Sequence, residues 1–192
     1  MVKGRGFLIG MLAWLLLAGI AMAQAPAPNK SERAARLETL FAELHTTKNA
    51  DRGTELTGEI WQHWRNSGRR DVDALTSDAT RLMAIGQLEA ARTVLDRVVA
   101  LAPDHSEGWN MRATVLYLIG EHALSLIDID QVLKLEPRHF GALSGQGLIH
   151  LAARRWALAL ISFRRAVAVN PFLAERTTVI PDLERKVEGQ PL

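Results

Sequence analysis

The chain has 192 residues, of which 48% are hydrophobic, so it can bury the core of one domain or of one short repeat array. Its 23 lysine and arginine residues nearly balance 21 aspartate and glutamate residues, and it has no long serine, glutamine or acidic tract of the kind found in wholly disordered chains. It has no cysteine, which excludes disulfides, thiolate metal sites, cysteine nucleophiles and a lipid-modified N-terminal cysteine.

The first residues have the pattern of a secretory signal peptide. Lys3 and Arg5 precede an apolar stretch over residues 7–20, and Ala21-Met22-Ala23 has the small-x-small form that signal peptidase accepts. The apolar stretch is shorter than the roughly 20 residues that span a bilayer. We therefore expect residues 1–23 to be a signal peptide removed after Ala23, with an uncleaved membrane anchor as the alternative.

Removal of residues 1–23 changes the charge of what remains. That segment holds two basic residues and no acidic one, so the rest of the chain has 21 basic residues (23 minus 2) against 21 acidic ones. The isoelectric point near 9.3 is therefore no sign of nucleic-acid binding, and we expect no nucleic-acid partner. The prolines of residues 24–30, Pro26 and Pro28, predict an extended linker.

Residues 31–71 predict a degenerate N-terminal helical hairpin. Ser31 can cap the first helix, and the second helix is expected over about residues 52–66, before the stop signal Ser67-Gly68. Apolar residues at spacings of three and four predict the inward faces, which contain Ala34, Leu37, Leu40, Phe41 and Leu44 in the first helix and Leu56, Ile60, Trp61 and Trp64 in the second.

A unit of 34 residues recurs three times in the next part of the chain. The units span residues 72–105, 106–139 and 140–173, and they carry Pro103, Pro137 and Pro171 at the same place. Repeats of this length are read as two antiparallel helices each. Because proline disfavours helical geometry in the residue before it, the second helix of each unit is expected to end there.

Small residues recur where the two helices of a unit would cross. The eighth and twentieth positions hold Ala79 and Ala91, then Ala113 and Ser125, then Gly147 and Ala159. Helices approach to about 8 Å only where the facing side chains are small, so these pairs predict helix–helix contacts. The fifteenth position holds Gly86, Gly120 and Arg154. Glycine tolerates the left-handed backbone that closes a helix, so Arg154 predicts a costlier or differently shaped turn.

These units resemble the tetratricopeptide repeat (TPR) family. The resemblance rests on Trp109, Ala113, Gly120 and Pro137 in the middle unit and on Gly147, Ala159, Phe163, Ala166 and Pro171 in the third. Arg112 and Arg154 depart from the leucine and glycine usual in that family. The resemblance implies an all-α fold, a right-handed α-solenoid of antiparallel helix pairs with three clear TPR units. It is weak for function, because the motif residues are packing residues.

The ends of the array need covering, since a repeat buries its face only on a neighbour. Residues 31–66 fit the register as a degenerate first unit, in which Trp61 takes the twenty-fourth position but His45 and Thr57 stand at the small positions. At the other end, residues 174–192 predict a C-terminal capping helix and tail, which Pro181 should kink or restart.

The chain offers little for catalysis or metal binding. None of its six histidines has metal-ligand spacing, and His105 and His139 occupy equivalent turns. Asp128 and Asp130 point about 200° apart on a helix, so we expect ion pairs, with Arg97 or Arg164 as a partner, rather than an acid–base pair. We therefore predict no enzyme activity, no cofactor and no metal site.

The inner surface of the array is the candidate binding site. In the TPR family, ligands usually lie against the first helix of each unit, which here implies the partner-binding residues Thr76, Thr80, Met83, Asn110, Thr114, Tyr117, Ser144, Leu148 and Leu151. The concave positions carry no lysine or arginine, so the resemblance does not extend to TPR domains that clamp a terminal carboxylate with basic side chains. We expect an apolar or amphipathic protein segment there; the alternative is that Leu148 and Leu151 only pack on the C-terminal helix.

The sequence thus indicates a non-enzymatic protein-binding scaffold of the bacterial cell envelope, periplasmic or secreted. One alternative is an assembly factor anchored in the inner membrane by an uncleaved N-terminal helix. Another is an enzyme or small-ligand carrier, for which Asp73, Asn110 and Tyr117 are too sparse a polar set to suggest a reaction.

Overall fold

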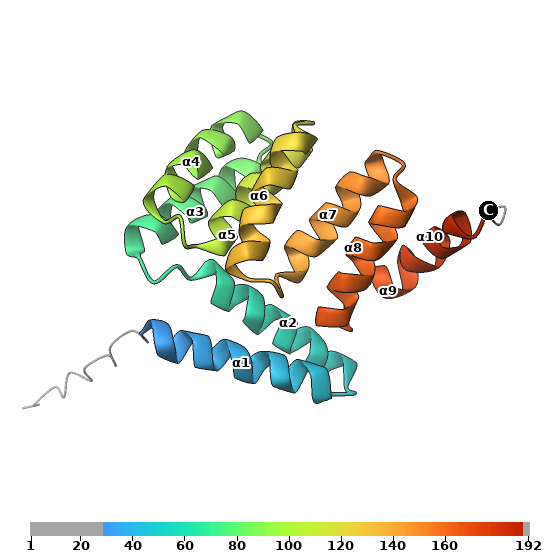
Figure 1. Ribbon diagram of the computed structural model, residues 1–192. Coiled ribbons are helices and arrows are strands. Elements are labelled where there is room, and N and C mark those ends of the chain that lie inside the picture. Colours follow the sequence, from blue (N-terminus) through green and yellow to red (C-terminus); the bar gives the residue numbers. More distant parts are fainter. Residues whose placement is uncertain (1–28, 190–192) are drawn as a thin grey trace, which may run out of the picture.

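The computed structural model describes residues 29–189, which form helices and no strand (Figure 1). The helices are α1 (Lys30–Thr46), α2 (Ala50–Arg65), α3 (Arg70–Ala84), α4 (Leu88–Leu101), α5 (Ser106–Leu118), α6 (His122–Leu135), α7 (Phe140–Ala152), α8 (Trp156–Val169), α9 (Glu175–Thr178) and α10 (Ile180–Val187). The all-α prediction is confirmed. No described helix is long and apolar enough to cross a membrane. The predicted signal peptide and most of the predicted linker lie outside the described residues, and Asn29 and Lys30 already belong to the start of α1.

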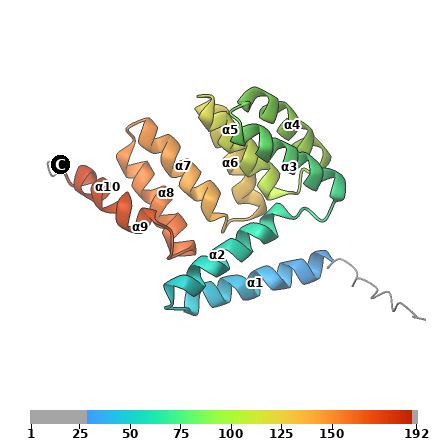
Figure 2. The same cartoon turned by 180° about the vertical axis from the view of Figure 1, so that it is seen from behind.

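Three antiparallel helix pairs, α3–α4, α5–α6 and α7–α8, stack side by side as predicted from the 34-residue period (Figures 1 and 2). The small residues at the eighth and twentieth positions are buried in all three pairs. In the middle pair the Ser125 hydroxyl donates a hydrogen bond of 2.7 Å to the Ala113 carbonyl oxygen. In the third pair a Cβ on Gly147 would lie 2.8 Å from the Phe163 ring. Close helix approach therefore depends on these small residues.

The turns inside the three pairs share one backbone shape. Gly86, Gly120 and Arg154 have φ values of 74°, 87° and 55°, all in the left-handed region. The next residue donates its N–H five residues back in each case, with Arg155 N to His150 O at 2.9 Å in the third pair. The sequence allowed for a differently shaped turn at Arg154, but this turn has the same shape as the other two. It imposes on an arginine the conformation that glycine takes in the other two pairs.

The second helix of each pair ends two residues before its proline. α4, α6 and α8 finish at Leu101, Leu135 and Val169, ahead of Pro103, Pro137 and Pro171. The three turns that follow, which we call the proline turns, comprise residues 102–105, 136–139 and 170–173. They gather along one edge of the array.

The N-terminal hairpin forms, but it does not stack as a first unit in series with the others. α1 and α2 run along the edge of the array where the proline turns lie (Figures 1 and 2). One polar contact reaches each turn: Lys30 to Asp104 at 3.2 Å, Glu38 to Arg138 at 2.9 Å, and Thr57 to Asn170 at 2.9 Å. The hairpin therefore spans all three repeats.

Aromatic side chains explain this placement. Trp64 and Trp61 of α2 pack on Phe140 at the start of α7, with ring centroids 4.8 and 5.3 Å away. Trp61 also covers Gly141, where any Cβ would collide with its ring. Trp61 thus packs against the third unit instead of taking the twenty-fourth position of a unit of its own.

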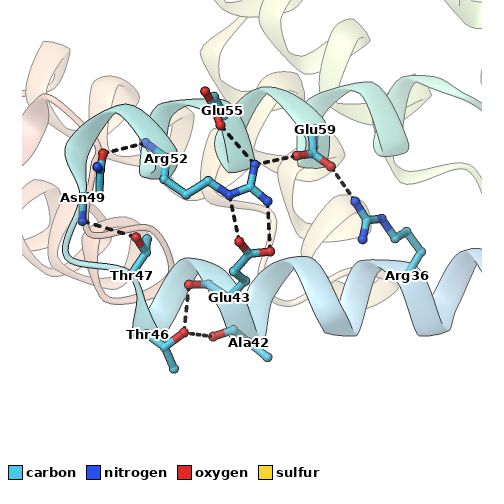
Figure 3. Close-up of polar contacts among 9 residues, drawn as sticks. All are labelled: Arg36, Ala42, Glu43, Thr46, Thr47, Asn49, Arg52, Glu55 and Glu59. Atoms are coloured by element: carbon cyan, nitrogen blue, oxygen red, sulfur yellow. Dashed lines mark hydrogen bonds and ion pairs between the residues drawn. The ribbon is translucent and has the colours of Figure 1, made fainter.

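An arginine-centred network holds α1 against α2 (Figure 3). Arg52 donates to both carboxylate oxygens of Glu43 at 2.7 and 3.0 Å, and to Glu55 and Glu59 at 3.1 Å. Arg36 donates to the second oxygen of Glu59 at 2.6 Å. The hydrogen bonds from Arg52 lower the pKa of Glu43. The network ties the two helices of the hairpin together at its exposed surface.

The C-terminal segment covers the last pair, as predicted. Pro181 lies in the first turn of α10. The helix is interrupted at Val179, which ends α9 and precedes α10. Ile180 and Leu183 of α10 are buried in one cluster with Leu160 and Phe163 of α8. The helix restarts at the proline and closes the array.

Candidate functional site

The concave face of the array is built by the first helices α3, α5 and α7, which supply all nine candidate residues. The structure does not gather the nine into one site. It divides them between two cavities and two hydrophobic clusters.

Five of the candidates meet in a cavity of about 150 Å³ between α5 and α7, which we call the groove cavity. They are Asn110, Thr114, Tyr117, Ser144 and Leu148. Gly141 and Gly145 of α7 also line the cavity, and Ala113, Ser125, Ile129 and Ala142 complete its walls. Leu148 is 40% exposed, so it is free to contact a bound segment.

The polar groups of the groove cavity are mostly engaged within the protein. The Thr114 hydroxyl donates to the Asn110 carbonyl oxygen at 2.9 Å, and the Asn110 amide donates to Glu107 at 2.9 Å. The Tyr117 ring stacks on His122 with centroids 5.1 Å apart. The buried Ser144 hydroxyl has no hydrogen-bond partner in the described protein. What the cavity presents is therefore mainly apolar surface, together with the buried Ser144 hydroxyl.

A second cavity of about 380 Å³ lies at the α3 end of the concave face. Thr76 and Thr80 line it, and each hydroxyl donates to a backbone carbonyl of its own helix. The opposite wall comes from α2 and includes Gln62, Arg65 and Asn66. The concave positions themselves carry no cation, but the hairpin brings Arg65 to their edge. The sequence held no signal for this, because it depends on where the hairpin lies.

The two remaining candidates are packing residues in this structure. Met83 packs with the core of α3 and α4, and Leu151 packs with the cluster that α8 and α10 form. For Leu151 this matches the alternative that it supports the C-terminal helix. Leu148, three residues earlier, faces the groove cavity instead.

A buried polar chain links the concave face to the hairpin. The Ala142 N–H donates to His139 Nδ1 at 3.2 Å, so the proton of the neutral ring lies on Nε2, which donates to Glu107 at 3.1 Å. His139 is fully buried, and the Trp64 ring stacks on it. The sequence placed His139 in a turn equivalent to that of His105 but did not identify Glu107 as its partner.

Asp128 pairs with neither Arg97 nor Arg164, the partners expected for it. Its two carboxylate oxygens accept hydrogen bonds of 2.7 Å from Arg112, which also reaches Asp96 at 2.9 Å. The hydrogen bonds with Asp128 raise the pKa of Arg112. Arg112 departs from the leucine usual at its position because it neutralises a buried aspartate. Asp130 is exposed, so the two aspartates do not act as a pair.

Within residues 29–189, no group of three or more histidine, aspartate or glutamate side chains could hold a metal ion.

Sequence comparison agrees with this architecture. The sequence model of the tetratricopeptide repeat matches residues 78–131 and 128–174, which together cover half of the chain. The chain belongs to the tetratricopeptide repeat family. This TPR protein is 36% identical over 142 residues to a TPR repeat-containing protein of Rhizobium etli, covering 74% of this chain and 69% of the relative.

Solved structures resemble this TPR protein in fold. The first TPR domain of Spaghetti (RPAP3), bound to the HSP90 peptide SRMEEVD, superposes with a TM-score of 0.58 at 15% identity, over 61% of this chain and 93% of that one. MamA from Desulfovibrio magneticus superposes with a TM-score of 0.55 at 18% identity, over 82% of this chain and 86% of that one.

Proposed function

We propose that this protein is a non-enzymatic adaptor whose concave face binds an apolar or amphipathic segment of a partner protein. The observation that carries the proposal is the groove cavity, where five candidate residues, including the exposed Leu148, surround a mainly apolar space. An open apolar recess with few free polar groups is suited to an apolar side chain.

The size of the groove cavity indicates what it would hold. A dry protein cavity of about 150 Å³ accommodates benzene, so one leucine, methionine or phenylalanine side chain of the partner would fill it. The unpartnered Ser144 hydroxyl is available to a backbone group of the same segment. Peptide binding by the similar first TPR domain of Spaghetti supports an interaction role for this fold.

A matched pair of substitutions tests the proposal. Leu148→Glu places a charge at the groove cavity, whereas Leu158→Glu places the same charge on α8 at similar exposure, 45% against 40%. Partners that co-purify with the wild type from an envelope extract should be lost with Leu148→Glu and with Thr114→Arg, and kept with Leu158→Glu. Retention of the same partners by both groove variants would rule out the groove as their binding site.

We further propose that the protein acts in the bacterial cell envelope, exported by residues 1–23 and released after Ala23. The charged start, the apolar stretch and the small-x-small sequence support export. The intact mass of the protein recovered from the periplasm should equal that of residues 24–192. An intact mass that includes residues 1–23, in the membrane fraction, would instead support the anchored assembly factor.

A further inference from the structure

A cavity of about 490 Å³ that shares no lining residue with the groove cavity lies between the hairpin and the first proline turn. We call it the junction cavity. It falls within the range of about 300 to 1,000 Å³ that small-molecule sites occupy. Nothing in the adaptor function described above uses it.

Three helix N-termini meet at the junction cavity. Its walls include Asn29 and Lys30 at the start of α1, Gly68 and Arg69 before α3, and His105 and Ser106 at the start of α5. All three helices have 13 residues or more. The first N–H groups of a helix have no partner within it, and the aligned peptide dipoles favour negative charge at that end. A capping box between Asn29 and Glu32 already closes the N-terminus of α1, whereas neither Arg69 nor His105 caps its helix with a side-chain hydrogen bond.

Two buried nitrogen atoms of the cavity walls have no hydrogen-bond partner. Trp64 and His105 both line the cavity and are only 5% and 9% exposed. Trp64 Nε1 and His105 Nε2 are buried, and neither has a partner within the described residues. The indole N–H can only donate, and a buried donor without an acceptor is destabilising. The Trp64 N–H therefore favours a molecule with an oxygen acceptor, whereas His105 Nε2 donates or accepts according to its tautomer.

The charged side chains around the cavity favour an anion. Lys30, Arg33 and Arg69 line it, against Asp104 and Glu136, and Arg69 already pairs with Asp71 and donates to the Leu101 carbonyl oxygen, each at 2.6 Å. Both carboxylates already have cationic partners, since Asp104 pairs with Lys30 at 3.2 Å and Glu136 pairs with Arg138 at 3.0 Å. The Arg33 guanidinium donates to the Asn66 carbonyl oxygen, which leaves its remaining N–H groups free to face a ligand.

The cavity also has apolar walls, which a bare inorganic ion would leave uncovered. Ala34, Leu37, Ala102 and Leu135 line it beside the Trp64 ring. We propose that the junction cavity binds a small organic carboxylate, with its carboxylate group at the N-termini of α3 and α5 and its apolar body against α1 and Trp64. This site shares no lining residue with the groove cavity.

The test uses the whole protein, labelled with nitrogen-15, and benzoate as the probe. The indole N–H signal of Trp64, assigned with the Trp64→Phe variant, should shift saturably with benzoate at millimolar concentration or below. Benzamide, which has nearly the same shape but no charge, should leave that signal in place. Calorimetric titration of benzoate gives the affinity without any spectroscopic assignment.

Lys30, which is exposed, and Arg33, which is half-buried, supply the variants, because neither belongs to the hydrophobic core. Lys30→Gln and Arg33→Gln should each weaken benzoate binding by about tenfold, the loss expected for one charged hydrogen bond. Arg36→Gln, the same kind of change on the same helix, should bind like the wild type, because Arg36 does not line the cavity. Leu148→Glu should also bind benzoate normally, which separates this site from the groove.

Three outcomes would overturn the proposal. They are no saturable shift of Trp64 with benzoate, an equal shift with benzamide, and phosphate binding as tightly as benzoate. The first result would mean that the two nitrogens meet only water. The second would show that the cavity does not require a negative charge on the ligand. The third would show that the apolar part of the ligand contributes nothing to binding.

Discussion

The Trp64 ring lies parallel to the His139 ring, with centroids 4.0 Å apart and an interplanar angle of 12°. Trp64 belongs to the hairpin and His139 to the second proline turn, so this stacking contact is one of those that join the hairpin to the repeat array. His139 in turn donates to Glu107, whose carboxylate also accepts from Asn110 on the concave face. The position of the hairpin is therefore coupled to the concave face by continuous packing.

Trp64→Ala should release the hairpin from the array. Removing a buried tryptophan side chain costs about 3 to 5 kcal/mol, and here the loss falls on the contact between the two parts. We expect faster amide hydrogen exchange throughout α1 and α2. Trp156→Ala, the same change at the start of α8, should leave exchange in α1 and α2 unchanged. Protection of the hairpin in Trp64→Ala at wild-type levels would show that Trp64 does not hold it.

The parts of the fold that the sequence predicted depend on contacts within a repeat. Ala113 and Ser125 lie twelve residues apart and repeat with the period, so spacing alone identifies them as neighbours. The position of the hairpin depends instead on contacts such as Glu38 with Arg138, one hundred residues away, which no periodicity encodes. The hairpin's lack of small crossing residues, with His45 and Thr57 at those positions, was the available sign that it would not stack as a repeat.

The candidate site was predicted in part for the same reason. Repeat positions placed Asn110, Thr114 and Leu148 on one face, because each position recurs on the same side of its helix. They gave no information on Arg65, which α2 brings to that face from outside the repeats. The junction cavity was missed entirely, since it forms only where the hairpin meets the array.

Arg112→Leu should be strongly destabilising even though it restores the residue usual in the family. Asp128 is 2% exposed, and without Arg112 its charge would be buried without a partner. Breaking such a pair costs about 3 to 5 kcal/mol, whereas replacing both members by apolar residues can be neutral. Urea unfolding should therefore show a large loss for Arg112→Leu and recovery of most of it in Arg112→Leu/Asp128→Leu. Equal losses in the single and double variants would contradict this account.

Arg154→Gly should stabilise the protein. Arg154 has a φ of 55°, a conformation that costs a residue with a Cβ about 1 kcal/mol and costs glycine little. The gain is expected to be smaller than that figure, because glycine also increases the freedom of the unfolded chain. Gly120→Ala, which makes the opposite change in the preceding turn, should destabilise by about 1 kcal/mol. Thermal unfolding measures both, and a lower midpoint for Arg154→Gly than for the wild type would refute the strain argument.

Stability should fall as the pH decreases from 7 to 5, and His105 should account for part of the loss. Burial lowers the pKa of His105 below its ordinary value of 6.5, because the charged ring would lose its hydration. The unfolded chain then binds a proton that the folded protein does not bind, so the free energy of unfolding declines as the pH falls through that range. Burial lowers the pKa values of His63 and His150 in the same direction. Arg138 and Arg52 lower the pKa values of Glu38 and Glu43, so the stability that these carboxylates contribute is lost mainly as the pH falls below their ordinary value of 4.5, and equally in wild type and His105→Phe. Urea unfolding at a series of pH values measures this. The free energy of unfolding should decline less steeply with falling pH in His105→Phe than in the wild type. Parallel profiles would show that His105 titrates in the folded protein as it does in the unfolded chain.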